Sequence, residues 1–182
     1  MTGYPGRQVN WYVIAGPPSS GKTAVAAALA EQGYGIVPDE ARTLLEEGLA
    51  DGRTAQQVRR DVALFQGKVM DRKCRIAETY DPEELVFWDY GLAETVAFYR
   101  LENLDVSPAL LDRVQQFRFA GVFLLEQLAW DEDAVRTEDT LIQRRLASLI
   151  REAYLELGYQ LYRIPQATVA ERVTMILEQT SR

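Results

Sequence analysis

The chain has 182 residues, 47% of them hydrophobic, with 20 basic and 27 acidic side chains, and a formal charge of −7. Such a chain is long enough for one domain with a sizeable core, and its acidic balance argues against nucleic acid as a partner. The sequence has no histidine and a single cysteine, which excludes imidazole bases and an intrachain disulfide. We therefore expect a cytoplasmic protein in which carboxylates, lysine, tyrosine or water carry out any acid–base chemistry.

The N-terminal residues 1–8 are mostly glycine, proline and polar side chains, and we expect them to be flexible and to carry no hydrophobic leader. Residues 9–182 contain no linker, internal repeat or low-complexity segment, which predicts a single domain. No window approaches the ~20 apolar residues of a membrane-spanning helix, so no membrane span is expected.

Apolar runs and helical segments alternate along the chain. The predicted strands are residues 9–16, 34–38, 85–89, 121–126 and 159–164. The predicted helices are residues 23–33, 39–48, 54–79, 92–103, 108–117, 140–158 and 168–179. This alternation predicts an α/β fold in which helices cover both faces of a five-stranded parallel sheet.

The stretch AGPPSSGKT follows the first predicted strand and matches the pattern G-x-x-x-x-G-K-[ST]. In a loop of this kind the backbone and the following helix N-terminus surround phosphate oxygens, the lysine reaches the β- and γ-phosphates, and the hydroxyl binds Mg²⁺. A chance Gly-Lys-Thr turn is the alternative, which the strand before and the helix after disfavour. The sequence therefore predicts ATP or GTP with Mg²⁺ as cofactors, bound by Gly16, Pro17, Pro18, Ser19, Ser20, Gly21, Lys22 and Thr23.

A second metal ligand is predicted at the end of the third strand, where Asp89 follows the apolar run LVFW. Ligands of open α/β sheets bind at the carboxyl ends of the strands, so Asp89 is expected to face the same crevice as Lys22. The alternative is an ordinary N-cap of the next helix.

Candidate acceptor-binding residues follow the second predicted strand. Asp39 is placed to orient or deprotonate an acceptor hydroxyl, and Arg42, about one helical turn further on, is placed to face the same crevice. The alternative is a helix start, with Asp39 as its cap and Arg42 in solvent. Gln66 lies beside the apolar stripe of the predicted helix 54–79, where it is a candidate to hydrogen-bond an acceptor, although a surface position is equally compatible with the pattern.

A polar, charged segment around 129–145 is predicted to form a mobile lid. An arginine on such a lid brings a bidentate positive group onto a phosphoryl group in transfer, which makes Arg136 the candidate. Arg144 and Arg145 are weaker candidates on the following helix. The alternative for all three is a solvated charged surface.

Taken in order, several of these motifs resemble the AAA_28-type P-loop ATPase/kinase-like domains, which are related to the nicotinamide riboside kinase domain of the bacterial NAD regulator. The motifs are AGPPSSGKT, VPDEAR, the Phe65-Gln66 pair, FWDYG, VFLLE, D-x-x-R-T-E-D and Tyr-x-x-x-Gly-Tyr, and they cover about residues 10 to 180. The resemblance implies a nucleoside- or nucleotide-kinase-like fold with parallel strands in the order 2-3-1-4-5.

The resemblance also implies roles for individual residues. Asp39 and Arg42 match the family's Glu/Asp-x-x-Arg after the second strand, Asp89 matches the Asp of its Asp-Arg-Gly motif, and Arg136 matches its lid arginine. The chain departs from the family at Tyr90, where relatives have an arginine that contacts acceptor or phosphate.

The sequence as a whole predicts a Mg²⁺-dependent P-loop enzyme that transfers a γ-phosphoryl group to a small, nucleoside-like hydroxyl or to water, with Lys22, Asp39 and Arg136 as catalytic residues. The alternative is a nucleotide-dependent switch with slow hydrolysis that acts on a protein or lipid partner. A degenerate P-loop scaffold that binds no nucleotide is a third reading. The acceptor, the choice between ATP and GTP, and the oligomeric state stay open.

Overall fold

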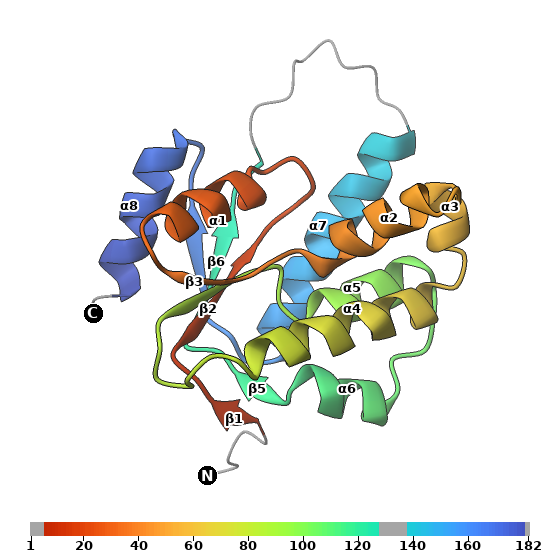
Figure 1. The fold of residues 1–182 in the computed structure, drawn as a ribbon, viewed down its shortest axis with the longest axis horizontal. Helices are drawn as coiled ribbons and strands as arrows, with labels where there is room; N and C mark the ends of the chain where they lie inside the picture. The colour runs from red at the N-terminus through yellow and green to blue at the C-terminus, as the bar shows by residue number, and fades with distance from the viewer. Residues whose placement is uncertain (1–5, 128–137, 181–182) are drawn as a thin grey trace.

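The computed structural model describes residues 6–127 and 138–180. A five-stranded parallel sheet lies at its centre, with the strands in the order β3-β4-β2-β6-β7 (Figure 1). The five strands in chain order are β2 (Trp11–Ala15), β3 (Gly35–Val37), β4 (Val86–Asp89), β6 (Gly121–Leu125) and β7 (Leu161–Ile164). These correspond to the five predicted strands, so the α/β class and the predicted order 2-3-1-4-5 are both confirmed.

Helices cover both faces of this sheet (Figure 1). One face is covered by α1 (Lys22–Glu31) and α8 (Val169–Thr180). The other is covered by α4 (Val62–Ala77), α5 (Glu94–Leu101), α6 (Pro108–Val114) and α7 (Glu138–Glu156). The chain leaves β3 through α2 (Glu40–Ala50) and α3 (Ala55–Val58), and α2 packs beside α4. No helix in the described ranges has both the length and the apolar character of a membrane span.

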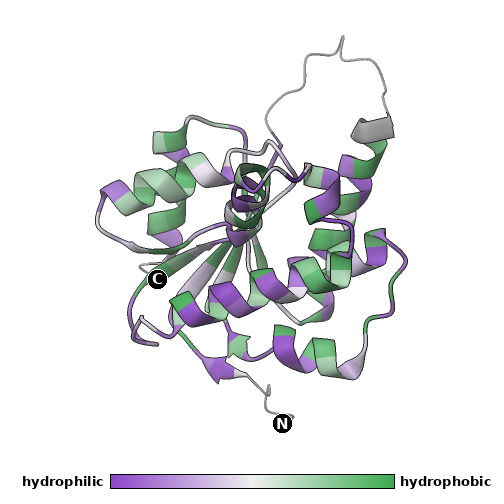
Figure 2. Cartoon of the chain, turned by 45° about the vertical axis from the view of Figure 1, so that its right-hand side comes forward, coloured by the Kyte–Doolittle hydropathy of each residue, from purple (hydrophilic) through white to green (hydrophobic). Residues whose placement is uncertain are grey.

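The alternation of side chains along each strand divides the core into two layers. Val13 and Trp88 point to the layer under α4–α7, whereas Ile14 and Phe87 point to the layer under α1 and α8. All four are 0% exposed. Because both faces are covered, the strands are mainly apolar, as the green on the strands at the centre of Figure 2 shows, and the exposed Arg163 lies on the edge strand β7.

The long helix predicted for residues 54–79 is wrong, because two separate helices form there. Thr54 starts α3 through a capping box with Gln57, and Asp61 starts α4 by accepting a hydrogen bond from Leu64 N at 2.9 Å. Each cap accepts a hydrogen bond from a backbone N–H group in the first turn of its helix, and inside a continuous helix such a group would bond to the preceding turn. The break lets α3 return to α2, where Val58 fills the space beside Gly48.

A second, two-stranded parallel sheet joins β1 (Arg7–Gln8) to β5 (Phe117–Arg118). Neither position is predicted as a strand from the sequence, because two residues carry no readable alternation. The Arg7 N–H also donates to Gln116 O at 2.9 Å, so residues 7 and 8 have a regular backbone partner within the segment expected to be flexible.

The two buried tryptophans of the central strands should differ in how well they tolerate phenylalanine. Their rings stack with centroids 5.9 Å apart, but only the Trp11 Nε1–H has a partner, donating to Asp81 O at 3.1 Å. Trp88 Nε1 is buried without a partner among the described residues. We expect Trp11→Phe to lower the free energy of unfolding by about 1 kcal/mol more than Trp88→Phe, measured by urea denaturation. Equal losses, or a larger loss for Trp88→Phe, would contradict this.

Candidate nucleotide-binding site

The loop between β2 and α1 has the backbone that a phosphate-binding loop needs. Gly16 has φ 150° and Gly21 has φ 85°, so both lie where side chains are disfavoured. A Cβ at Gly16 would lie 2.7 Å from the Leu125 carbonyl oxygen. Gly21 caps α1 without a side-chain hydrogen bond, which leaves the first amides of the helix available to an anion.

Lys22, the lysine at the end of this loop, is buried, with 6% of its surface exposed. Its Nζ donates to Pro17 O at 2.7 Å and to Ser20 Oγ at 3.3 Å, and it lies 4.4 Å from the centre of the Tyr90 ring. Burial lowers the pKa of Lys22 to about 8, while the carboxylates of Asp89, Glu94 and Asp39 act in the opposite direction. Lys22 is therefore still mainly charged at neutral pH, as binding of phosphate requires.

Thr23 and Asp89 form the second part of the site. Thr23 Oγ1 donates to Asp89 Oδ2 at 2.8 Å, and Asp89 Oδ1 is buried without a partner among the described residues. Burial raises the pKa of Asp89, against the hydrogen bond from Thr23 and the charge of Lys73. A hydroxyl beside a carboxylate oxygen that lacks a partner fits Mg²⁺, which is held in proteins by few side chains together with phosphate oxygens and water.

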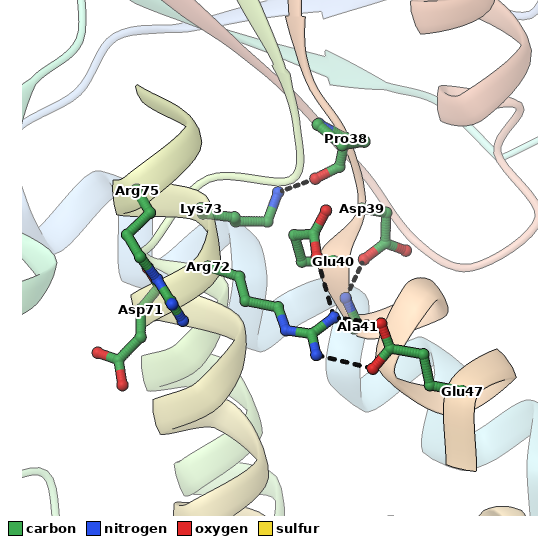
Figure 3. Close-up of polar contacts among 9 residues, drawn as sticks. All are labelled: Pro38, Asp39, Glu40, Ala41, Glu47, Asp71, Arg72, Lys73 and Arg75. Atoms are coloured by element: carbon green, nitrogen blue, oxygen red, sulfur yellow. Dashed lines mark hydrogen bonds and ion pairs between the residues drawn. The ribbon is translucent and has the colours of Figure 1, made fainter. Parts of the chain in front are cut away.

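A cleft of about 690 Å³ opens beside the loop, and it brings together most of the predicted site residues. Its wall includes residues from α1, α2, α4, α5 and α7, among them Lys22, Thr23, Asp39, Arg42, Gln66, Lys73, Tyr90, Glu94, Thr95, Phe98 and Gln143. Asp39 is half-buried just after the carboxyl end of β3, and its Oδ1 accepts a hydrogen bond from Ala41 N at 3.1 Å (Figure 3). Asp39 is thus both the N-cap of α2 and a wall of the cleft, so the two readings of this residue are compatible.

The other acceptor-side candidates occupy different depths. Gln66 is 5% exposed and lines the cleft, which excludes the surface alternative. Arg42 lies at the rim, where its Nε is 3.7 Å from Glu46 Oε1 and 64% of its side chain is exposed.

Of the three arginines considered for the lid, Arg136 lies outside the described residues. Arg144 and Arg145 are exposed and do not line the cleft.

Lys73 is a cleft residue that the sequence analysis missed. It is 1% exposed, and its Nζ donates to Pro38 O at 2.8 Å, Asp89 O at 2.6 Å and Tyr90 O at 2.8 Å. Burial lowers its pKa, opposed first by the charge of Asp39. Lys73 falls on the apolar stripe of α4 at a spacing of four from Val69 and from Ala77, a signal that could have identified it as buried.

The neighbouring Arg72 connects α4 to α2 instead. Figure 3 shows its guanidinium between the carboxylates of Glu40 and Glu47, while Lys73 turns toward Pro38. The two hydrogen bonds to Glu47 measure 2.8 and 2.7 Å, and Glu40 Oε2 lies 3.6 Å away. Because Glu47 is exposed, this pair contributes little to stability, and the packing of Leu44 against Phe65 and Val69 holds α2 beside α4.

Glu94 is the second residue that the sequence analysis missed. Its side chain is 3% exposed, and its Oε2 accepts from Gly91 N at 2.9 Å and from Tyr154 Oη at 2.6 Å. Its Oε1 is buried without a partner among the described residues. Burial raises the pKa of Glu94 to about 7, against the hydrogen bond from Tyr154 and the charge of Lys73.

A buried arginine supports the loop from the side opposite the cleft. Arg172 of α8 is 1% exposed and donates to Ser20 O in the loop, to Pro165 O at 3.0 Å and to Glu126 O at 3.0 Å. One guanidinium therefore ties the phosphate loop to the ends of β6 and β7. Burial lowers its pKa.

The fold and the loop together define a P-loop protein of the α/β class. More particularly, the chain belongs to the AAA_28 family: the family model, described as an AAA domain, matches residues 11–172, which confirms the resemblance found in the sequence. A search of curated proteins gave no match.

Solved structures with low sequence identity share the fold. A thymidylate kinase from Ehrlichia chaffeensis is 14% identical with a TM-score of 0.64, over 95% of this chain and 98% of that one. A deoxyadenosine kinase from M. mycoides, with the products dCMP and dCDP bound, is 16% identical with a TM-score of 0.59, over 94% and 98%. The NadR protein in complex with NR is 16% identical with a TM-score of 0.70, over 96% of this chain but only 52% of NadR.

The buried carboxyl of Glu94 should make stability depend on pH in a defined direction. Because the pKa of Glu94 rises from 4.5 to about 7 on folding, its contribution is complete below pH 4.5 and is lost as the pH rises through 7. Glu94→Gln removes this pH-dependent contribution. Between pH 5.5 and pH 8 the free energy of unfolding of the variant, relative to that of wild type, should therefore rise by roughly 2 kcal/mol.

Urea unfolding of both proteins at the two pH values measures this gain, and Glu102→Gln, at an exposed position, controls for the change in net charge. A difference between Glu94→Gln and wild type that does not change with pH would show that the carboxyl is not held in a desolvated place.

Proposed function

We propose that this protein is a Mg²⁺-dependent phosphotransferase that moves the γ-phosphoryl group of ATP or GTP to a hydroxyl of a small, nucleoside-like acceptor. The observation that carries this proposal is the shared cleft. Lys22, Thr23, Asp39 and Gln66 all line it. A cleft that brings phosphate-binding groups and a carboxylate together suits direct transfer between two bound substrates.

On the nucleotide side, the loop amides and Lys22 bind the phosphates, and Thr23 and Asp89 hold Mg²⁺. When bound, Mg²⁺ neutralises charge on the phosphate oxygens. Arg136 is the proposed lid cation that covers the transferring group, on the strength of the sequence motif alone.

On the acceptor side, Asp39 orients the hydroxyl and accepts its proton. Gln66, buried with both an amide donor and an amide acceptor, hydrogen-bonds the ring system of the acceptor, and Arg42 approaches from the rim. The ligands of the structural relatives support this class of acceptor, since NadR binds NR and the deoxyadenosine kinase holds dCMP.

A nucleotide-dependent switch is the second candidate, favoured by one feature. Tyr90 stands where the resemblance implies an arginine, and its ring lies over Lys22 while its hydroxyl donates to Gly16 O at 3.2 Å. The position therefore offers an acceptor phosphate no guanidinium. A switch would bind the triphosphate and hydrolyse it slowly, and would not respond to a small acceptor.

The proposal predicts that nucleotide turnover depends on an acceptor and on Asp39. With ATP or GTP and Mg²⁺, at least one of adenosine, cytidine, thymidine, thymidine monophosphate or nicotinamide riboside should raise the rate of diphosphate release tenfold or more. Asp39→Asn should lower this stimulated rate by about 10²- to 10⁴-fold, because a general base is lost. A coupled assay of diphosphate formation measures both.

Two controls separate the possible outcomes. Asp51→Asn changes a carboxylate at the other end of α2 and should keep the stimulated rate, whereas Lys22→Ala should abolish triphosphate binding. Turnover that no acceptor changes would reject the kinase and favour the switch. A wild-type protein that binds no triphosphate would reject both.

A further inference from the structure

The contacts of Lys73 are unusual for a buried lysine. The residue is 1% exposed, and among the described residues its ammonium group has three hydrogen-bond partners, all backbone carbonyl oxygens at 2.6 to 2.8 Å, with no carboxylate among them. Burying an ammonium group costs several kcal/mol unless it is well paired. A methionine or leucine at this place would satisfy the apolar stripe of α4 without that cost, so the stripe alone does not account for a lysine.

The three carbonyl groups favour the charged form of the side chain. An ammonium group carries three N–H donors and no acceptor, so three carbonyl oxygens use its full capacity. A neutral amine would turn its lone pair toward one of the three oxygens. With every donor engaged, Lys73 has none left for a substrate, although it borders the cleft.

The three carbonyl groups belong to peptides beside the proposed functional residues. The carbonyl groups of Asp89 and Tyr90 lie on either side of the Tyr90 Cα, where φ is 60°. A non-glycine residue in this left-handed region costs about 1 kcal/mol or more, and it persists where its surroundings hold it. Lys73 thus fixes both peptide groups of a strained turn that begins at the proposed Mg²⁺ ligand.

The third carbonyl group belongs to Pro38, whose peptide leads into Asp39 (Figure 3). Since β3 and β4 are adjacent strands, the same ammonium group joins their two carboxyl ends. Beyond the last paired residues of β3 and β4, Lys73 thus adds a direct link between the backbone that leads into Asp39 and the backbone of Asp89.

We propose that Lys73 is a positioning residue that holds the metal carboxylate of Asp89 and the acceptor carboxylate of Asp39 in register through their backbone. This inference rests on the proposed function. It adds a residue that touches neither substrate but determines whether the metal side and the acceptor side of the cleft are correctly spaced.

The test compares ATP affinity with and without Mg²⁺. Isothermal titration of wild type, Lys73→Met and Lys68→Met in EDTA, and again in excess Mg²⁺, gives for each protein the factor by which the metal strengthens binding. Lys68→Met is the matched control, because it removes the same charge from an exposed position on the same helix. GTP replaces ATP if it is the tighter ligand.

We expect Lys73→Met to lose tenfold or more of the metal-dependent factor while its affinity in EDTA stays within threefold of wild type. Lys68→Met should keep both. A merely structural role would lower thermal stability, or both affinities together, and leave the metal-dependent factor unchanged. Lys73→Gln, which keeps an amide donor, carries the same test and the same thresholds if Lys73→Met does not fold.

The outcomes separate this inference from the proposed function. A metal-dependent factor within threefold of wild type in the folded Lys73 variant overturns the inference alone. Loss of the factor in Lys68→Met as well assigns the effect to net charge and also overturns it. A wild-type protein that binds neither ATP nor GTP overturns the proposed function and the inference with it.

Discussion

The order of the parallel strands is the constraint on which the site depends. β2 lies at the centre of the sheet, so the loop that follows it emerges between the ends of β4 and β6, and β3 lies one strand further out. Parallel strands bring all their carboxyl ends to one edge, and this collects Lys22, Asp89 and Asp39 from distant parts of the chain. A different order would place the same three side chains at separate points of the edge. The site is thus a property of the topology before it is a property of any single side chain.

That edge of the sheet is held by buried cations bonded to the backbone. At the carboxyl ends of parallel strands, the neighbouring strand offers no further N–H donor to the last carbonyl oxygens. Burying these oxygens without another partner would be costly. Lys73 satisfies those of β3 and β4, and Arg172 satisfies those of the phosphate loop and of the ends of β6 and β7. Both cations thereby add positive potential on either side of a place that is built for phosphate. Carboxylate partners would have satisfied the charges but would have cancelled that potential.

The sheet and the phosphate loop could be predicted from the sequence, because they follow from local patterns. Five apolar runs gave the strands, and the spacing from Gly16 to Thr23 gave the loop between the first strand and its helix. The placement of Asp89 at the crevice of Lys22 followed from the rule that ligands gather at strand ends. Lys73, Glu94 and Arg172 were missed because charged residues in helices are usually solvated. For Lys73 the apolar stripe of α4 carried a readable signal, but the backbone partners of all three come from tertiary packing. The division of residues 54–79 into α3 and α4 was missed because the apolar period continues through Asp61, whose capping hydrogen bond ends that continuity.

The contact between Tyr90 and Lys22 has a consequence for selectivity among anions. In the free protein the ammonium group of Lys22 already has internal ligands: a carbonyl oxygen, a hydroxyl and the face of an aromatic ring. An incoming anion must replace these internal contacts of Lys22. Its observed affinity is therefore the difference between the new ion pair and the contacts that are lost, and not the full strength of the ion pair. A polyphosphate meets this competition better than a single orthophosphate, because the loop amides and the helix N-terminus bind several of its oxygens at the same time. Tyr90 is therefore one of three internal partners of Lys22 with which a ligand must compete for the ammonium group.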